Sequence, residues 1–214
     1  MTSVEAGPVG VFGGTFDPVH LGHLRLAEEA RERFALDRVL WIPAGRPPHR
    51  IPPVAAAEHR LSMVELAVSG NGAFVTEAGE LGTAMPSYTI DTLGRLRRTL
   101  GEERPLVLLV GADAFKGLAE WHRWREIFAL AHLAIATRPG HDLDADGLPA
   151  ELAAELAARR VDRLPDEPAG SIARFSLTAL EISATAIRKL LAGGGSPRYL
   201  VPERVLDYIE SHSL

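Results

Sequence analysis

The sequence contains no cysteine among its 214 residues. Without thiols the chain cannot form disulfides, cysteine-ligated zinc sites, iron–sulfur clusters or a thiol nucleophile, so its chemistry must use oxygen and nitrogen groups. It also lacks an apolar run of 18 residues, and residues 1–8 do not combine a charged start with an apolar stretch of signal length. We therefore expect a cytoplasmic protein without a membrane partner.

A surplus of positive charge is also missing. The chain carries 23 Lys and Arg residues against 28 Asp and Glu residues, which gives a formal net charge of −5. Broad nucleic-acid binding normally requires a positive surplus, so we do not expect a nucleic-acid partner. A small anionic ligand would instead need cations that are gathered locally.

Segments typical of strands and helices alternate along the chain. Short apolar runs bounded by Gly or Pro indicate buried strands, and apolar residues that return every three or four positions indicate helices. This alternation predicts an α/β fold with a Rossmann-like, doubly wound parallel sheet and flanking helices, as one domain over residues 1–214. The expected strands are 9–12, 39–42, 74–76, 106–110 and 133–136, and the expected helices are 21–34, 59–69 and 88–100.

The last third of the chain has a different composition. Residues 142–170 are rich in Ala, Leu, Asp, Glu and Arg, and they contain one expected helix at 150–160. We interpret this segment as a peripheral insertion, whose helix could be a solvated amphipathic helix or a partner-binding one. A short strand near 173–177 precedes a C-terminal helical portion, which begins with a helix at 183–191 and ends with one that starts at Pro202.

Chemically interesting residues follow several of the expected strands. In open parallel sheets the ligand crevice lies at the carboxyl ends of the strands, where the strand order reverses. The sequence therefore directs attention to four segments: 13–23, 44–53, 111–115 and 137–140.

The first of these segments, residues 13–23, reads GGTFDPVHLGH. The adjacent Gly13 and Gly14 allow a close approach of the backbone to a ligand, and the following helix offers N–H groups to an anion. His20 and His23 are three positions apart, so both rings can face the same way with Gly22 leaving space between them. A structural role or a metal site is the alternative, but no third metal ligand of matching spacing is nearby.

These eleven residues resemble the signature of the nucleotidyltransferase superfamily that has His-x-Gly-His at its core. The resemblance implies that the two histidines hold the ATP phosphates during attack on the α-phosphorus. The ATP-binding residues that it implies in this segment are Gly13, Gly14, Thr15, Phe16, His20 and His23.

A second motif, residues 182–188, reads ISATAIR and opens a helix. Ser183 is a favourable N-cap, so ordinary helix capping with Arg188 as a solvated charge is one interpretation. The segment also resembles the superfamily motif Ile-Ser-Ser-Thr-x-x-Arg, with Ala184 in place of the second Ser. The resemblance implies that Ser183, Thr185 and Arg188 bind ATP phosphates, and that Arg188 is catalytic together with the two histidines.

Further segments resemble the branch of the superfamily that uses nicotinic acid mononucleotide as acceptor. His49 and Arg50, in the sequence PPHR, could meet phosphates, although an exposed proline-rich turn explains them almost as well. The sequence PSYTIDTL at 86–93 resembles the segment in which backbone and Thr groups meet the nicotinate carboxylate. It implies that Ser87, Tyr88 and Thr89 bind the acceptor.

Three more acceptor-binding residues follow from the same resemblance. Asp113 is a candidate contact to a ribose or nucleotide, with helix capping as the alternative. Trp121 matches an aromatic residue that stacks on the pyridine ring, although simple packing would also explain it. His122 stands where the family often has Tyr. Arg138 matches the arginine that the family directs at the mononucleotide phosphate.

The resemblance extends from about residue 9 to residue 209. It implies that ATP and nicotinic acid mononucleotide give nicotinic acid adenine dinucleotide and pyrophosphate, in NAD biosynthesis, by direct in-line displacement. Mg²⁺ would arrive with ATP rather than in a metal site of the protein. The alternatives are another acceptor, nicotinamide mononucleotide or phosphopantetheine, and a non-catalytic nucleotide sensor. The sequence leaves both a monomer and a homodimer open.

Overall fold

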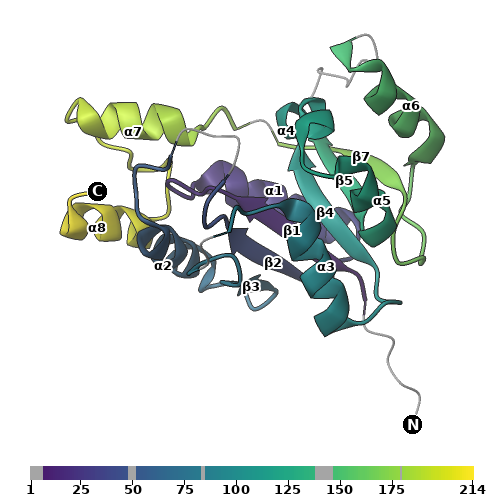
Figure 1. Ribbon diagram of the computed structural model, residues 1–214. Helices are drawn as coiled ribbons and strands as arrows, with labels where there is room; N and C mark the ends of the chain where they lie inside the picture. Colours follow the sequence, from purple (N-terminus) through teal and green to yellow (C-terminus); the bar gives the residue numbers. More distant parts are fainter. Residues whose placement is uncertain (1–6, 48–51, 83–84, 138–146, 179) are drawn as a thin grey trace.

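The computed structural model describes residues 7–47, 52–82, 85–137, 147–178 and 180–214. Within these ranges the chain forms a seven-stranded sheet in the order β3-β2-β1-β4-β5-β7-β6, and its neighbouring strands pair in parallel (Figure 1). The strands are β1 (Val9–Gly14), β2 (Arg38–Pro43), β3 (Phe74–Thr76), β4 (Leu106–Gly111), β5 (His132–Thr137), β6 (Arg160–Val161) and β7 (Ile172–Ser176).

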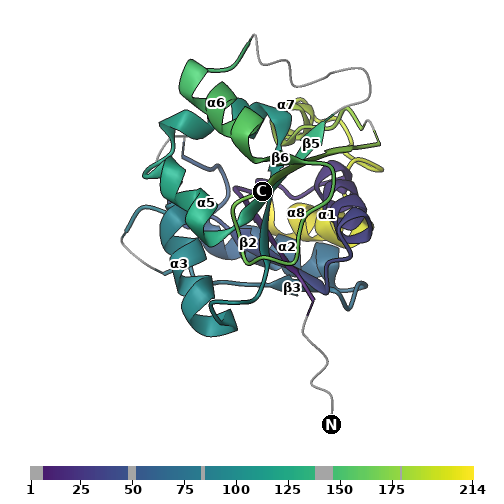
Figure 2. The same ribbon diagram turned by 90° about the vertical axis from the view of Figure 1, so that its right-hand side faces the viewer.

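Helices cover both faces of this sheet. Figure 2 shows α3 and α5 on one side of the strands and α1 on the other, which is the arrangement that right-handed crossovers produce when the strand order reverses. The α-helices are α1 (Leu21–Arg33), α2 (Ala57–Val68), α3 (Thr89–Leu100), α4 (Ala112–Lys116), α5 (Ile127–Leu130), α6 (Ala150–Arg159), α7 (Ala184–Ala192) and α8 (Glu203–His212). Two short 3₁₀ helices, η1 (Leu118–Glu120) and η2 (Trp124–Glu126), connect α4 to α5.

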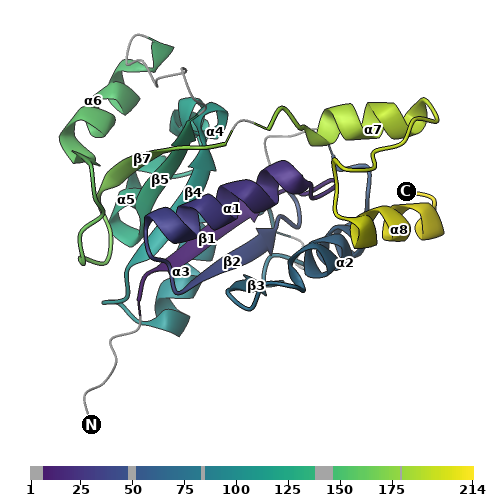
Figure 3. The ribbon, with the colours of Figure 1, turned by 180° about the vertical axis from the view of Figure 1, so that it is seen from behind.

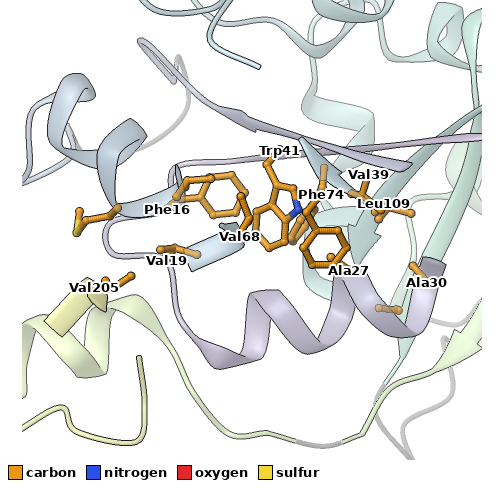
Figure 4. Close-up of a cluster of buried hydrophobic side chains, with 14 of the residues drawn as sticks. Phe16, Val19, Ala27, Ala30, Val39, Trp41, Val68, Phe74, Leu109 and Val205 are labelled. Carbon is orange, nitrogen blue, oxygen red and sulfur yellow. The ribbon is translucent and has the colours of Figure 1, made fainter. Parts of the chain in front are cut away.

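Helices cover each face of the sheet, so the strands carry apolar side chains on both faces. One buried cluster lies between the sheet and α1 and α2, and Figure 4 shows Phe16, Trp41 and Phe74 packed within it. A second cluster lies on the opposite face and includes Leu108 and Leu133. Strands buried on both faces have nearly continuous apolar sequences, as the sequence of β4 has.

The segment between β5 and β7 adds a helix and an edge strand to the sheet. Leu152 and Leu156 of α6 are buried in the second cluster, and β6 pairs with β7 at the end of the sheet. The apolar face of α6 therefore packs against this protein's own core.

The C-terminal helices lie beyond one end of the sheet. Figure 3 shows α7 and α8 on the same side of the molecule, and α8 packs against α2. The contact buries Val205, Leu206 and Ile209, and the ring of His59 on α2 is hydrogen-bonded to the Tyr208 hydroxyl at 2.9 Å. This arrangement places the beginning of α7 near the loop that follows β1.

The predicted fold class is confirmed. Each predicted strand and helix is present, with ends that differ by at most two residues. The short elements α4, α5, η1, η2 and β6 were not predicted. No helix in the described part of the chain is long and apolar enough to cross a membrane.

Candidate active site

The reversal of strand order falls at β1, which pairs with β2 on one side and β4 on the other. β2 leads outward to β3, whereas β4 leads outward to β5 in the other direction. The loops that follow β1, β2 and β4 therefore meet at the same edge of the sheet. The Ala44 N–H, just after β2, donates to the Gly14 carbonyl at 2.8 Å and joins two of these loops.

The two glycines of the first motif are the last residues of β1 rather than the start of a loop. Among the residues that the structure describes, a Cβ at Gly13 would meet nothing within 4 Å, so this position faces open space there. A Cβ at Gly14 would lie 2.8 Å from the Phe16 ring. Gly13 therefore leaves room for a ligand, whereas Gly14 makes room for a side chain of the protein itself.

Phe16 turns inward at the tip of this loop. Its φ of 50° is in the left-handed region, its side chain is 2% exposed, and its ring meets the His23 ring edge to face at 5.1 Å. Figure 4 shows Phe16 among the core side chains. The Phe16 ring therefore packs against His23 and into the core, so its side chain is not available to a ligand at this loop.

Arg60 on α2 is a buried cation that lies outside the sequence motifs described above. It is 1% exposed, and it donates to the carbonyls of Thr15 at 2.7 Å, Gly45 at 3.3 Å and Ala55 at 3.2 Å. Burial lowers the pKa of Arg60 from its usual value. The helical period places Arg60 on the same face as the buried Met63 and Val64. An arginine on an apolar helix face was the sequence signal that could have identified it.

His20 and His23 stack at the beginning of α1. Their ring centroids are 3.6 Å apart with an interplanar angle of 23°. The His23 Nδ1 accepts a hydrogen bond from the His20 backbone N–H at 3.2 Å. Because only an unprotonated nitrogen can accept, the His23 ring is neutral in this geometry and carries its hydrogen on Nε2.

The His20 ring is also neutral at physiological pH. It is 6% exposed, and burial lowers its pKa to about 4. Its Nδ1 is buried without a hydrogen-bond partner among the described residues. The pair therefore offers hydrogen-bonding nitrogens rather than two positive charges to a phosphate.

Part of the N-terminus of α1 is already used by the protein. The Leu21 N–H donates to the Leu200 carbonyl at 3.0 Å, and the His20 N–H is bound by His23 as described above. The N–H groups that this helix was expected to offer to an anion therefore do not include those of His20 and Leu21. The chain that precedes α8 folds back and satisfies one of them.

The second motif lies next to the first. A Cβ at Gly22 would be 3.8 Å from the Ile182 Cβ. Arg188 donates through Nη1 to the Asp17 carbonyl at 2.5 Å, and the same nitrogen is 3.7 Å from the Asp17 carboxylate. Residues that are 171 positions apart in sequence are thus in direct contact, as the proposed phosphate site requires.

Within this motif, Ser183 and Thr185 have local partners. Ser183 is the N-cap of α7, and its Oγ accepts from the Ala186 N–H at 3.2 Å. The Thr185 hydroxyl accepts from Arg188 Nη2 at 3.4 Å. The capping interpretation of Ser183 is confirmed, and Thr185 orients the guanidinium beside the loop after β1.

Ser87 joins two segments of the predicted acceptor site. Its Oγ accepts from the backbone N–H groups of Gly45 and Arg46, each at 3.0 Å, and its own N–H donates to the Arg46 carbonyl at 3.0 Å. The side chain therefore fixes the chain after β2 against the start of α3.

The other described acceptor candidates lie at the ends of α3 and β4. Tyr88 is the N-cap of α3, and its ring lies 4.4 Å from the His122 ring. Trp121 packs partly against the second core cluster. Asp113 is exposed in the first turn of α4, whose N-cap is Gly111, so the alternative that Asp113 caps this helix was wrong.

Three predicted site residues, His49, Arg50 and Arg138, lie outside the described residues. Among the residues that the structure does describe, no group of three His, Cys, Asp or Glu side chains is placed to hold a metal ion.

The comparison with known proteins agrees with this geometry. The model of the cytidylyltransferase-like family matches residues 11–190, so the chain is a member of that family. The probable nicotinate-nucleotide adenylyltransferase of Dechloromonas aromatica (strain RCB) is 58% identical over 210 residues, which cover 97% of each chain. That of Laribacter hongkongensis (strain HLHK9) is 47% identical over 215 residues, covering 100% of this chain and 97% of the relative. The chain thus belongs to the nicotinate-nucleotide adenylyltransferases, which are nucleotidyltransferases.

A solved structure with a similar fold is that of the Plasmodium falciparum nicotinic acid mononucleotide adenylyltransferase complexed with NaAD. It superposes with a TM-score of 0.72, is 14% identical in sequence, and covers 97% of both chains. At this level of identity the comparison shows that the two proteins share a fold.

Proposed function

We propose that this member of the family aligns ATP and nicotinic acid mononucleotide for direct in-line transfer of the adenylyl group. The observation that carries the proposal is the meeting of two distant motifs at the end of β1. The stacked His20 and His23 and the Arg188 guanidinium all lie around the loop that contains Asp17. A polyanion placed there would meet two imidazoles and a fixed cation.

On the donor side, the three groups have different tasks. The His23 ring carries its hydrogen on Nε2 and can donate it to a phosphate oxygen, and His20 holds that ring in place by stacking. Arg188 supplies positive charge for the leaving pyrophosphate. Gly13 leaves the edge of the sheet open for the nucleotide. Gly14, Thr15, Phe16, Ser183 and Thr185 keep these groups in position.

On the acceptor side, the mononucleotide phosphate is already ionised near neutral pH and needs no general base. Its oxygen attacks the α-phosphorus of ATP, the bond to the β-phosphate oxygen breaks, and pyrophosphate leaves with that electron pair. Such alignment of two reactants can contribute on the order of 7–11 kcal/mol to the lowering of the barrier. The acceptor would be bound by His49, Arg50, Ser87, Tyr88, Thr89, Asp113, Trp121 and Arg138.

Magnesium enters as part of the ATP substrate. Mg²⁺ prefers oxygen ligands and keeps several waters, and the triphosphate supplies such oxygens. The ion adds positive charge to the phosphates. The chain's own contribution is to hold the complex with neutral imidazoles and one guanidinium.

The test is pyrophosphate release from ATP with three acceptors, assayed side by side. We expect turnover with nicotinic acid mononucleotide that is clearly faster than with nicotinamide mononucleotide or phosphopantetheine. A preference for the amide acceptor would replace our assignment with a related adenylyltransferase. ATP binding without pyrophosphate release from any acceptor would favour a nucleotide sensor.

A further inference from the structure

The turn after β3 contains a carboxylate that the proposed chemistry does not use. Glu80 is partly buried, and this burial raises the pKa of its carboxyl. The Thr92 hydroxyl donates to Glu80 Oε1 at 2.6 Å. The Ser87 hydroxyl lies near enough to this carboxyl to oppose the rise of its pKa as a hydrogen-bond donor. Both hydroxyls belong to the beginning of α3, one just before its first turn and one within it.

The two backbone N–H groups that Ser87 binds leave its hydroxyl hydrogen without a backbone partner. A hydroxyl has one hydrogen and two acceptor lone pairs. Both lone pairs of Ser87 face backbone N–H groups, those of Gly45 and Arg46. The hydroxyl hydrogen is left for a third partner, and the nearby Glu80 carboxylate, whose pKa Ser87 helps to lower, is the acceptor that suits it. The carboxylate thereby fixes the rotation of the Ser87 hydroxyl.

The backbone of Glu80 also contacts the chain that follows β2. A Cβ at Gly45 would lie 2.1 Å from the Glu80 carbonyl oxygen, so the two main chains pass in direct contact. Glu80 thus touches the segment that leads from β2 toward His49 and Arg50 through its backbone. It touches the segment that carries Tyr88 through its side chain.

We propose that Glu80 is a positioning residue for the acceptor half of the active site, in which its carboxylate orients the Ser87 and Thr92 hydroxyls and thereby fixes the spacing between the chain after β2 and the start of α3. This role rests on the proposed function, because it assumes that these two segments bind nicotinic acid mononucleotide. The donor groups His20, His23 and Arg188 lie on other segments, so the role predicts an effect on one substrate and not the other.

The experiment compares Glu80→Gln with Glu77→Gln. Gln retains the size of Glu80 but removes its charge and places an NH₂ donor where the carboxylate had an acceptor oxygen. Glu77 is a matched control on the same segment, because its carboxylate is also bound by a side chain of α3, through two hydrogen bonds from Arg95 at 2.9 and 2.7 Å. Thr92→Val removes one of the two hydroxyls that meet Glu80.

Steady-state kinetics with each substrate varied in turn give the readout. We expect Glu80→Gln to raise KM for nicotinic acid mononucleotide about tenfold while KM for ATP stays within about twofold, the scale of one lost hydrogen bond to a charged group. Glu77→Gln should change both values by less than about twofold. Thr92→Val should raise the acceptor KM by a smaller factor, and it should add nothing to Glu80→Gln because the two share one network.

Equal changes in both KM values, or an acceptor KM within twofold of wild type, would show that Glu80 serves stability alone. If Glu80→Gln does not fold, Thr92→Val decides, and an unchanged acceptor KM in that variant overturns the proposal. Failure of the proposed function is a separate result, because the wild-type protein itself would then not use nicotinic acid mononucleotide.

Discussion

The donor and acceptor halves of the proposed active site are built in different ways. The donor half comes from two short motifs, and its main groups contact one another directly: His20 stacks on His23, and Arg188 binds Asp17. The described part of the acceptor half is gathered from segments after β2, β3 and β4. There, Ser87 accepts from two backbone N–H groups after β2, and Glu80 accepts from the Thr92 hydroxyl of α3.

The two halves also bury opposite kinds of titratable group. The donor half buries an imidazole, and burial lowers the pKa of His20 to about 4. The acceptor half buries a carboxyl, and burial raises the pKa of Glu80. In both cases burial disfavours the charged form. The difference indicates that the donor half is fixed by packing of neutral rings, whereas the acceptor half depends on hydrogen bonds to a carboxylate.

The largest expected effect tests the donor half. His23→Ala should lower kcat by at least roughly a hundredfold, because it removes one preorganised donor to the developing charge. The KM for nicotinic acid mononucleotide should change little. Thermal unfolding should show that the fold persists, and His212→Ala, which removes an exposed histidine at the end of α8, is the matched control. Near-normal turnover of the His23 variant would refute the role assigned to that ring.

A second prediction uses pH to test the buried imidazole of the donor half. The pKa of His20 is about 4 in the folded protein and 6.5 in its reference state, so the unfolded chain binds the proton more readily. The associated stability is present above pH 6.5 and is lost as the pH falls toward 4. Between pH 7.5 and pH 5, wild type should lose about 2 kcal/mol of unfolding free energy relative to His20→Phe.

The measurement is denaturant unfolding of both proteins at the two pH values. His132, whose pKa burial also lowers, titrates in both proteins and cancels in the difference. Glu80 has the opposite sign, because its raised pKa gives a contribution that is present below pH 4.5 and is lost as the pH rises above that value. Parallel pH profiles for wild type and His20→Phe would show that His20 is not buried as a neutral ring.

The sequence predicted the sheet well because its strands are apolar on both faces. A short apolar run such as Leu106–Gly111 is typical of a buried strand, and its ends are marked by Pro105 before it and by Gly111 itself. The short helices between Ala112 and Leu130 were not predicted, because three to five residues are too few to show a helical period. Their positions are set by packing against the sheet.

For the site, the sequence identified the groups that belong to compact motifs. It placed His20, His23 and Arg188 together through a resemblance, and the structure shows why distant segments meet: Leu200 binds the start of α1, and Arg188 reaches Asp17. It did not identify Arg60, whose partners are three backbone carbonyls. Every residue has a backbone carbonyl, so a sequence does not show which carbonyls a side chain will contact. Such contacts are seen only in the structure.

The smallest predicted effect compares two helical glycines, one beside a buried ring and one beside the end of a flexible side chain. Gly22 and Gly94 both lie in α-helices, where replacement by Ala should favour the helix by up to about 1 kcal/mol. A Cβ at Gly22 would lie 3.1 Å from two atoms of the His20 ring, whereas the nearest described atom to a Cβ at Gly94 is at the end of the Arg98 side chain, at 3.8 Å. Gly22→Ala must therefore displace a buried ring by a few tenths of an ångström, and that ring stacks directly on His23.

We expect Gly22→Ala to lower kcat about tenfold, since a misplacement of about 1 Å costs roughly a hundredfold and this one is smaller. Its thermal stability should stay close to that of wild type, because the gain in helix propensity offsets the strain at His20. Gly94→Ala should keep kcat within about twofold and raise the melting temperature. Equal activities in the two variants would mean that the donor half tolerates movement of its stacked rings. The contrast with the hydrogen-bonded acceptor half would then rest on the Glu80 and His23 substitutions alone.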